Sequence, residues 1–419
     1  MLYYVPLEAI KSRYSWQWSA PKTGWLERNW IRAGVEYHRI DPGFTMGPIK
    51  TGSVVDAVGR SIFCFEQIKT LLNMAENGQI KDNDVILFDD FWTPGLEALP
   101  YAFHLMGIKP SMYAFLHAQS VDEFDFTHSM RDWMRPIETG FANALDGIFV
   151  CCPTLKDLVC FGGIAPRHKV HVTGHPFNSE EVMERMPEWY RRGEIRGGTN
   201  SPDVESWGRK NQVVWSSRWD MEKNPQFFLQ VARDVIENTM CDARFIICTS
   251  APKLRSNSPL MLHALHEHVK MYPQRIFLKE GLSKEEYYAT LCESKVQFNC
   301  ANQDFVAITL LEASVAGCYP IYPYFRSFPE TFLWNKGSGF MYPHLDLQMA
   351  SHLICDVMMN PKLSHLWTAD KIKERSWIHR RFDYSWLRML NVMGVPAMNA
   401  TDEEMDVVCE WDPYVEEDW

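Results

Sequence analysis

Two carboxylates on either side of an expected helix start form the clearest chemical signal in the sequence. Asp304 and Glu312 are eight residues apart in the segment DFVAITLLEASVAG. The first N–H groups of a helix have no partner within the helix, so those near Ile308 and Thr309 predict a phosphate site. Glu312, one turn later, is placed to reach ribose hydroxyls. Asp304, in the loop before the helix, is placed to hold hydroxyls of a bound sugar.

A pair of cations forms a second signal in the segment VVWSSRWDMEKNP, which spans 213–225. We expect an apolar strand to end before Arg218, and Lys223 follows just ahead of the next helix. Arginine offers a planar fork of donors and lysine a point charge, a combination that suits a diphosphate. The alternatives are structural: a capping role or ion pair for Arg218, and a solvated helix face for Lys223.

Short apolar runs alternate with amphipathic stretches over almost the whole chain, which predicts parallel sheets covered by helices. The predicted strands are 2–6, 85–89, 112–117, 147–151, 169–173, 212–216, 244–249, 275–278, 295–299 and 319–322. The predicted helices include 25–33, 61–75, 95–106, 154–160, 225–238, 258–271, 283–292, 308–316 and 373–394. The fold class is therefore α/β, and such sheets bind ligands at the carboxyl ends of their strands.

The alternation lapses in a stretch rich in Gly, Pro, Asn, Ser and mixed charge. This lapse predicts a linker or mobile loop at 186–211, between one domain at 1–185 and a second at 212–372. The helical stretch at 373–401 is expected to return to the first domain. An acidic tail at 402–419 follows, and we expect it to be solvated and partly disordered.

These signals together resemble the retaining glycosyltransferases of the GT-B fold, in particular glycosyltransferase family 4. The matching segments are Arg218, Lys223-Asn224-Pro225, Glu312-Ala313, Ala316-Gly317, Pro320 and Pro329-Glu330. The sequence departs from the family where Asp304 replaces the usual Glu and Val306-Ala307 replace Phe-Gly. The resemblance is specific over 211–345 and architectural over 1–185. It implies two Rossmann-like domains that face each other across a cleft.

The resemblance implies an enzyme that moves a sugar, with retention, from a nucleotide diphosphate donor such as a UDP-sugar to a hydroxyl acceptor. Arg218, Lys223 and the helix start at 308–309 would neutralise the charge that grows on the leaving diphosphate. A leaving phosphate oxygen can take the proton of the acceptor, so a strong protein base is unnecessary. Transferases of this family need no metal ion and no other obligatory cofactor.

The family also implies further donor contacts outside these two segments. By this analogy, Leu278 and Lys279 lie where backbone groups hold the nucleobase. Gly24, just before a predicted helix, lies where the family has a glycine loop near the phosphates. His117, at a predicted strand end, resembles the family histidine that contacts the donor sugar. A hydrogen-bonded core or loop histidine is the alternative for His117.

Three acidic residues are candidates for contact with the acceptor. Asp89 and Asp90 follow a predicted strand and are placed to hold an acceptor hydroxyl. Their alternative is a strand-to-helix turn that carries an N-cap Asp. Asp122 lies in an acidic loop, where it either orients the acceptor or is simply solvated.

Basic residues near aromatic ones indicate nucleic acid as the acceptor. Arg191, Arg192 and Arg196 lie in or beside a Gly-rich loop, and the stretch 371–381 combines basic residues with a tryptophan. The opening segment YYVPLEAIKSRYSWQW also resembles glycosyltransferases of tailed phages, some of which glycosylate hydroxymethylated pyrimidines. We therefore expect double-stranded DNA with modified pyrimidines to be the acceptor. Surface solvation is the alternative for the basic runs.

Other functions fit the same residues. A cytoplasmic glycan or a lipid-linked saccharide is a rival acceptor, although no basic-apolar membrane-facing helix is visible in the first half. A non-catalytic GT-B-like subunit would bind a nucleotide sugar without turnover. An epimerase of this fold would act on a free nucleotide sugar and would need no macromolecular acceptor.

Composition limits the class of protein. The chain has 419 residues, 46% of them hydrophobic, which is ordinary for a globular protein of two or three domains. Its net charge of −11 is concentrated in 402–419, which holds nine of the 53 acidic and none of the 42 basic residues. Eleven cysteines without a C-x-x-C pair predict free thiols in a reducing cytoplasm, that of the host if a phage encodes the chain. We expect no membrane span and no secretion signal.

Overall fold

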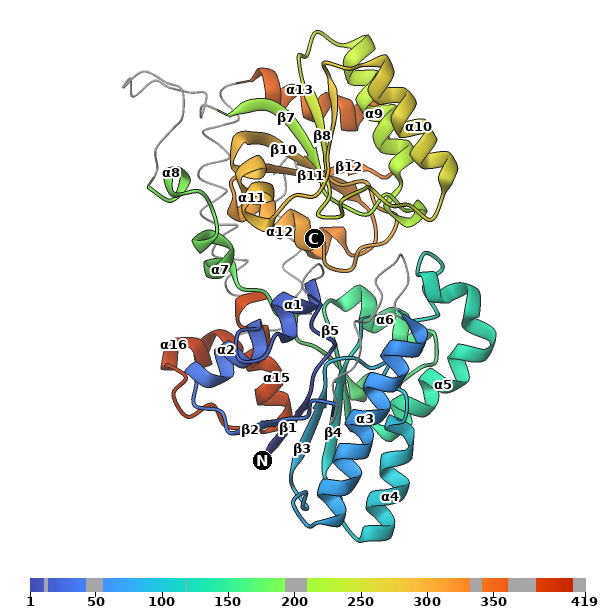
Figure 1. Ribbon diagram of the computed structural model, residues 1–419, viewed down its shortest axis with the longest axis vertical. Helices are drawn as coiled ribbons and strands as arrows, with labels where there is room; N and C mark the ends of the chain where they lie inside the picture. The colour runs from blue at the N-terminus through green and yellow to red at the C-terminus, as the bar shows by residue number, and fades with distance from the viewer. Residues whose placement is uncertain are drawn as a thin grey trace. The chain divides into compact units, whose positions relative to one another are not determined.

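The chain folds into two α/β units, each built on one parallel sheet (Figure 1). The structure is a computed structural model. It describes residues 1–10, 14–42, 56–117, 119–192, 209–331, 341–360 and 382–409. Unit 1 comprises Met1–Phe177 and Arg381–Trp419, and unit 2 comprises Asn178–Arg380. The break between the units therefore lies slightly ahead of the linker that the composition predicts.

The sheet of unit 1 has six parallel strands in the order β2-β1-β3-β4-β5-β6. Its strands are β1 Leu2–Val5, β2 Tyr37–Arg39, β3 Val85–Phe88, β4 Ser111–Phe115, β5 Gly147–Val150 and β6 Val170–Val172. Three of the four central strands are buried along their entire length, because helices cover both faces of the sheet. This burial is why they appear in the sequence as continuous apolar runs.

Helices surround this sheet, and in Figure 1 α3 and α4 lie on one side of it and α15 and α16 on the other. They are α1 Tyr14–Ser19, α2 Trp25–Arg32, α3 Ala57–Glu76, α4 Leu99–Met106, α5 Arg131–Ala144, α6 Pro153–Phe161, α15 Ser385–Met393 and α16 Asp402–Cys409. Short 3-10 helices are η1 Leu96–Ala98, η2 Phe126–Met130 and η3 Arg167–Lys169. Trp18 of α1 and both tryptophans of α2, Trp25 and Trp30, are fully buried, so these large aromatic side chains form part of the core of unit 1.

The sheet of unit 2 is also six-stranded and parallel, in the order β12-β11-β10-β7-β8-β9. Its strands are β7 Lys210–Trp215, β8 Arg244–Cys248, β9 Ile276–Lys279, β10 Ser294–Phe298, β11 Tyr319–Tyr324 and β12 Met341–Pro343. Counted along the chain, this is the strand order of a Rossmann fold. The helices are α7 Ser179–Glu184, α8 Glu188–Arg191, α9 Pro225–Asn238, α10 Pro259–Met271, α11 Lys284–Glu293, α12 Ile308–Val315 and α13 Leu347–Met359, with η4 Met221–Lys223 and η5 Phe328–Glu330.

Side-chain caps determine where several helices of unit 2 begin. Asn224 precedes α9 with a left-handed φ of 55°, and its side chain accepts the N–H of Phe227. Ser283 and Glu286 form a reciprocal capping box at the start of α11. Because the loops before α9 and α11 end at these caps, the residues just ahead of them are held in place.

Each sheet has one point where the order of the strands reverses, and open α/β sheets bind ligands at the carboxyl ends of the strands there. In unit 1 this switch lies between β1 and β3, and in unit 2 between β7 and β10. The connections after these four strands carry Gly24, Asp89, Asp90, Arg218, Lys223 and Asp304, and α12 follows the last of them. The fold therefore places part of the candidate residues beside the switch point of each unit.

Every predicted strand is present, with its ends shifted by at most a few residues. The pattern misses β2 and β12, which are three residues long, and the longer helices α5, which carries Pro136 inside it, and α13. Of the predicted C-terminal helix, α15 is described and residues 361–381 lie outside the described part. Among the described residues, no helix is both long and apolar enough to cross a membrane.

The first part of the acidic tail, which was expected to be solvated and partly disordered, forms α16, and two of its side chains are buried. Glu404 on this helix is buried, and its carboxylate lies 2.7 Å from the guanidinium of Arg32 on α2. Thr401 and Glu404 also cap the start of α16 reciprocally. The apolar side chain of Val408 is also buried and helps to hold α16 in place. Residues 410–419 lie outside the described part.

Candidate functional site

The loops after β7 and β10 meet through a lysine at the switch point of unit 2. Lys223 ends η4 and is buried, and its Nζ donates to the carbonyl of Gln303 at 2.6 Å. The same ammonium lies 3.4 Å from Oδ2 of Asp304. The N–H of Asn302 donates to the carbonyl of Glu222 at 2.8 Å, which ties the two loops together a second time. The structure therefore brings together Lys223 and Asp304, which the sequence separates by 81 positions.

Arg218 lies in the same loop but extends into solvent. About half of its side chain is exposed (52%), and its guanidinium lies 2.6 Å from Glu222 and 3.6 Å from Asp220. Asp220 is buried and accepts the N–H of Asn257 at 2.7 Å. The arginine is thus paired with carboxylates of its own loop at a half-exposed position.

The start of α12 provides hydrogen-bond donors beside this pair. The N–H of Ile308 is used in a tight turn, where it donates to the carbonyl of Val306 at 2.9 Å. The hydroxyl Oγ1 of Thr309 is shielded from solvent and has no hydrogen-bond partner among the described residues. A buried hydroxyl without a partner is unfavourable unless a ligand or water completes it. Of the two predicted phosphate contacts, Thr309 is the one left open for a ligand.

Glu312 is held inside unit 2 by its neighbours on α11. Its Oε1 accepts a hydrogen bond from Lys284 Nζ at 2.6 Å and from the hydroxyl of Tyr288 at 2.9 Å. The carboxylate side chain is 2% exposed. The ammonium of Lys284 also lies over the rings of Tyr287 and Tyr288, at 5.5 and 5.3 Å from their centroids. A ribose contact by Glu312 remains a prediction, and Lys284 is a partner that sequence reasoning missed.

The predicted nucleobase segment lies at the end of β9. Lys279 donates to the hydroxyl of Thr290 at 3.1 Å. Leu278 is half-buried, and the N–H of Gly281 donates to the carbonyl of Ala251 at 2.8 Å. These bonds fix the turn after β9, and no described contact tests the role in base binding.

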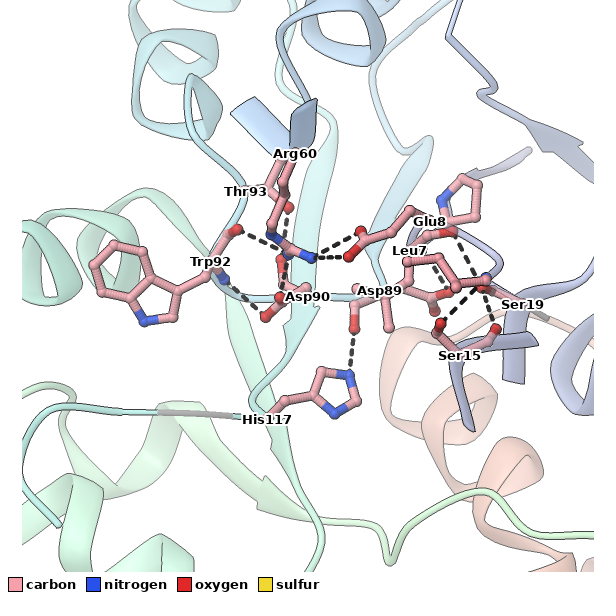
Figure 2. A network of polar contacts seen from close by, with 12 residues as sticks. Leu7, Glu8, Ser15, Ser19, Arg60, Asp89, Asp90, Trp92, Thr93 and His117 are labelled. Carbon is pink, nitrogen blue, oxygen red and sulfur yellow. Dashed lines mark hydrogen bonds and ion pairs between the residues drawn. The ribbon is translucent and has the colours of Figure 1, made fainter. Parts of the chain in front are cut away.

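Unit 1 has a second polar network at its own switch point, between β1 and β3 (Figure 2). Arg60 reaches from α3 to Glu8 after β1, with two guanidinium-to-carboxylate contacts of 2.8 Å. The same guanidinium forms an ion pair with Asp90 after β3 and donates to the carbonyl of Trp92 at 3.2 Å. One arginine therefore connects the ends of both strands. Sequence reasoning found Asp90 but missed Arg60 and Glu8.

Asp89 points into the unit rather than toward this network. Its Oδ2 accepts hydrogen bonds from the hydroxyl of Tyr4 and, at 3.2 Å, from the N–H of Leu7. Complete burial raises the pKa of Asp89 from its ordinary value to about 7, although both hydrogen bonds oppose the rise. Asp89 thus supports the loop after β1, and direct contact with an acceptor stays a prediction.

His117 follows β4 and is aimed at the same strand end (Figure 2). Its Nε2 lies 2.8 Å from the backbone carbonyl of Asp89, and since a carbonyl can only accept, Nε2 carries the hydrogen. Burial lowers the pKa of His117, so the ring is neutral at pH 7. The ring centroids of Trp18 and Phe115 lie 5.1 and 4.9 Å from the centroid of the imidazole ring. A neutral, oriented histidine fits both a hydroxyl contact and a packed core position.

Gly24 is the N-cap of α2, and a close backbone approach explains why it is glycine. A Cβ at this position would lie 2.5 Å from the carbonyl oxygen of Trp18. Its own N–H donates to the carbonyl of Ala20 at 2.7 Å. A phosphate contact near Gly24 remains a prediction.

The remaining predicted acceptor residues have local partners. Asp122 is buried, and its Oδ1 accepts the N–H of Phe124 at 3.0 Å, so it shapes a turn instead of lying solvated. Arg191 donates to the carbonyl of Met186 at 3.1 Å, and Arg192 forms an ion pair with Glu188. Arg196 and the basic stretch 371–381 lie outside the described residues.

The described residues contain no cluster of three or more His, Cys, Asp or Glu side chains that could hold a metal ion. The positively charged side chains at the described part of the site in unit 2 are arginine and lysine, and the N-terminus of α12 adds a partial positive charge. A charged ligand bound at the described part of this site would interact with these groups.

Comparison with known proteins finds a relative that is similar in sequence and solved structures that are similar in fold. No family model matches the chain. The tRNA-queuosine alpha-mannosyltransferase of Drosophila melanogaster is 27% identical over 244 residues, which cover 54% of this chain and 62% of that protein. The chain therefore spans less than two thirds of the relative's length.

Solved structures match over more of the chain. Sucrose-phosphate synthase from Thermosynechococcus elongatus superposes with a TM-score of 0.63 at 10% identity, over 93% of this chain and 97% of that one. TarM superposes with a TM-score of 0.55 at 14% identity, over 78% of this chain and 58% of that one. The chain has the GT-B fold. The fold class predicted from the sequence is thereby confirmed.

The GT-B architecture explains which site residues sequence reasoning could find. Residues in the loops after β7 and β10 lie in a recognisable motif, whereas Arg60, Glu8 and Lys284 lie outside it. The partners of Arg60 are 52 and 30 positions away in the chain. A basic residue in the first turn of a helix is unremarkable until the fold shows which carboxylates surround it.

Proposed function

We propose that this GT-B protein is a retaining glycosyltransferase that takes a sugar from a nucleotide diphosphate donor, a UDP-sugar in the first instance. The observation that carries the proposal is the cluster of Arg218, Lys223 and Asp304 at the switch point of the Rossmann-type unit. Two related structures support the choice of donor. TarM of S. aureus and the pneumococcal O-GlcNAc transferase GtfA were both solved in complex with UDP.

The proposed catalysis is electrostatic. Negative charge grows on the diphosphate as the bond to the sugar breaks, and preorganised cations stabilise it. Lys223 is preorganised because its ammonium is already fixed by Gln303 and Asp304. Arg218 supplies a second, exposed cation, and the open Thr309 hydroxyl supplies a neutral donor. This arrangement needs no reorganisation as the charge develops.

The proton of the acceptor can leave without a strong protein base. The departing diphosphate has an oxygen on the face from which the acceptor attacks, and this oxygen takes the proton. His117, whose Nε2 is bonded to the Asp89 carbonyl, is then a candidate contact of a sugar or acceptor hydroxyl. Asp90 and Arg60 maintain the shape of the adjoining loops.

We propose a modified nucleobase in a nucleic acid as the acceptor. The relative's name specifies a queuosine of tRNA, which favours an RNA base over the hydroxymethylated DNA pyrimidine expected from the sequence. Unit 1 exposes an aromatic ring and a cation in the first turn of α5, where Trp133 is 56% exposed and Arg131, 3.7 Å from Asp132, is 60% exposed. Exposed aromatic rings stack with bases, and arginine neutralises phosphate.

The proposal is tested by nucleotide release and nucleoside mass in the same reactions. UDP-sugars and GDP-sugars are supplied with tRNA that contains queuosine, with tRNA that lacks it, or with duplex DNA that contains 5-hydroxymethyluracil or 5-hydroxymethylcytosine. We expect release to depend on queuosine-containing tRNA and the nucleoside to gain the mass of one sugar. Release that depends on the DNA would instead indicate that the acceptor is the hydroxymethylated pyrimidine expected from the sequence.

Two further outcomes would contradict the acceptor or the activity. Release that no nucleic acid alters would indicate a glycan acceptor or hydrolysis. Absence of release with every donor would indicate a binding subunit. A Lys223→Met variant serves as the inactive control, matched by Lys253→Met, because Lys253 is 87% exposed in the same unit.

A further inference from the structure

The cations found from the sequence do not outnumber the carboxylates beside them. Arg218 lies near Asp220 and Glu222, and Lys223 lies near Asp304. Two positive and three negative side chains give this group a net charge of −1. A diphosphate brings further negative charge, so this part of the site needs another cation.

The loop after β11 supplies one. β11 is the neighbour of β10 in the sheet, with Phe298 paired with Ile321, so the two strands end at the same edge. The hydroxyl of Ser327 donates to the carbonyl of Asp304 at 2.9 Å. This bond holds the loop after β11 against the loop that contacts Lys223.

Arg326 occupies a strained position in that loop. Its φ is 52°, in the left-handed region that a residue with a Cβ rarely adopts. Its guanidinium lies over the ring of Phe305, 5.9 Å from the centroid. Phe305 directly follows Asp304 and comes shortly before the start of α12, where the Thr309 hydroxyl is open. Backbone strain of this kind concentrates at ligand sites, because the surrounding structure holds a residue where function requires it.

We propose that Arg326 is a third cationic residue of the donor site and binds the diphosphate of the nucleotide sugar. The inference rests on the proposed function and deepens it at the same site. With Arg326 included, the group holds three cations and three carboxylates, and the Thr309 hydroxyl adds a hydrogen-bond donor. The aromatic ring of Phe305 supports the guanidinium and limits its motion.

Calorimetric titration with UDP, GDP, uridine and guanosine tests the proposal. We expect Arg326→Gly to weaken binding of the preferred diphosphate about tenfold or more while binding of its nucleoside is unchanged. Glycine suits the left-handed backbone, so the melting temperature should not fall. Leu345→Gly is the matched control, because Leu345 also has a positive φ, of 64°, and carries no charge.

The outcomes separate this inference from the function on which it rests. Wild-type protein that binds neither diphosphate would overturn both. Wild-type protein that binds a diphosphate which Arg326→Gly binds equally well would overturn the role of Arg326 alone. If the glycine variant does not fold, Arg326→Gln keeps the length of the side chain, and undiminished diphosphate binding by that variant would overturn the proposal.

Discussion

Lys223 is the residue on which the proposed donor chemistry depends most. Its ammonium is buried between a carbonyl and the carboxylate of Asp304, so a diphosphate would meet it without competition from bulk water. Removing one preorganised donor of this kind costs about two to three orders of magnitude in rate. We therefore expect Lys223→Met to lower kcat by about a hundredfold, measured as UDP or GDP release. A Lys223→Met enzyme with the rate of Lys253→Met would contradict this role.

Asp89 makes the stability of unit 1 depend on pH. Its pKa is raised to about 7 in the fold from 3.8, so the folded protein binds a proton that the unfolded chain has lost between these values. The free energy of unfolding therefore falls as pH rises through this window, by up to about 1.4 kcal/mol per pH unit. Asp89→Asn cannot ionise, so the variant lacks this contribution. Urea unfolding at pH 5 and pH 7.5 measures both proteins.

Other groups titrate in the same range but are common to both proteins. Burial lowers the pKa of His175 from 6.5 to about 3. The contribution of His175 to the free energy of unfolding is therefore lost as pH falls below 6.5, whereas that of Asp89 is lost as pH rises. The difference between wild type and Asp89→Asn isolates the aspartate. Parallel pH profiles for the two proteins would show that Asp89 is ionised in the fold.

At the scale of elements, the junction of α1 and α2 is held by the contact at Gly24. An alanine Cβ there would lie 2.5 Å from the Trp18 carbonyl, so backbone must shift. We expect Gly24→Ala to lower the free energy of unfolding by about 1–3 kcal/mol. Gly140→Ala in α5 is the control, since its Cβ would meet nothing within 4 Å and alanine favours a helix. Equal stability of the two variants would contradict the steric role.

The first turn of α5 is expected to contact the nucleic acid acceptor. Base stacking on an aromatic ring contributes about 1–3 kcal/mol. Trp133→Ser should therefore weaken tRNA binding about tenfold in a filter or fluorescence assay and leave the melting temperature unchanged. Phe161→Ser is matched, because Phe161 is 84% exposed at the far end of α6. Unaltered tRNA affinity in Trp133→Ser would exclude this surface.

The limits of sequence reasoning also become clear at this scale. Strands such as β3 and β8 were predictable because burial on both faces leaves an unbroken apolar run. β2 was not predicted, because its three residues, Tyr37–Arg39, are polar and at most partly buried. Arg326 was not identified as a candidate site residue, because its left-handed backbone and its position over Phe305 arise from the packing of two loops. Residues in a motif can be found in a sequence, whereas residues made functional by packing cannot.

At the scale of the whole molecule, α16 packs into the first unit although it follows the second unit in the chain. Val408 is 6% exposed, so Val408→Asp would place an unpaired charge in its docking surface. Such burial costs a few kcal/mol. In scanning calorimetry, we expect the melting transition of unit 1 to shift down while that of unit 2 is unchanged. An unchanged transition for unit 1 would show that α16 does not stabilise it.

Unit 1 is discontinuous, since it joins Met1–Phe177 to Arg381–Trp419, whereas Asn178–Arg380 forms unit 2 without interruption. This connectivity sets an order of events on the ribosome. The strands of the first sheet are made before unit 2, but α15 and α16, which complete their unit, are made after it. The nascent chain must therefore carry an unfinished amino-terminal half while the second unit is synthesised and folds. Chaperones that shield exposed apolar surface would act chiefly on that half, and a stall late in translation would leave it incomplete.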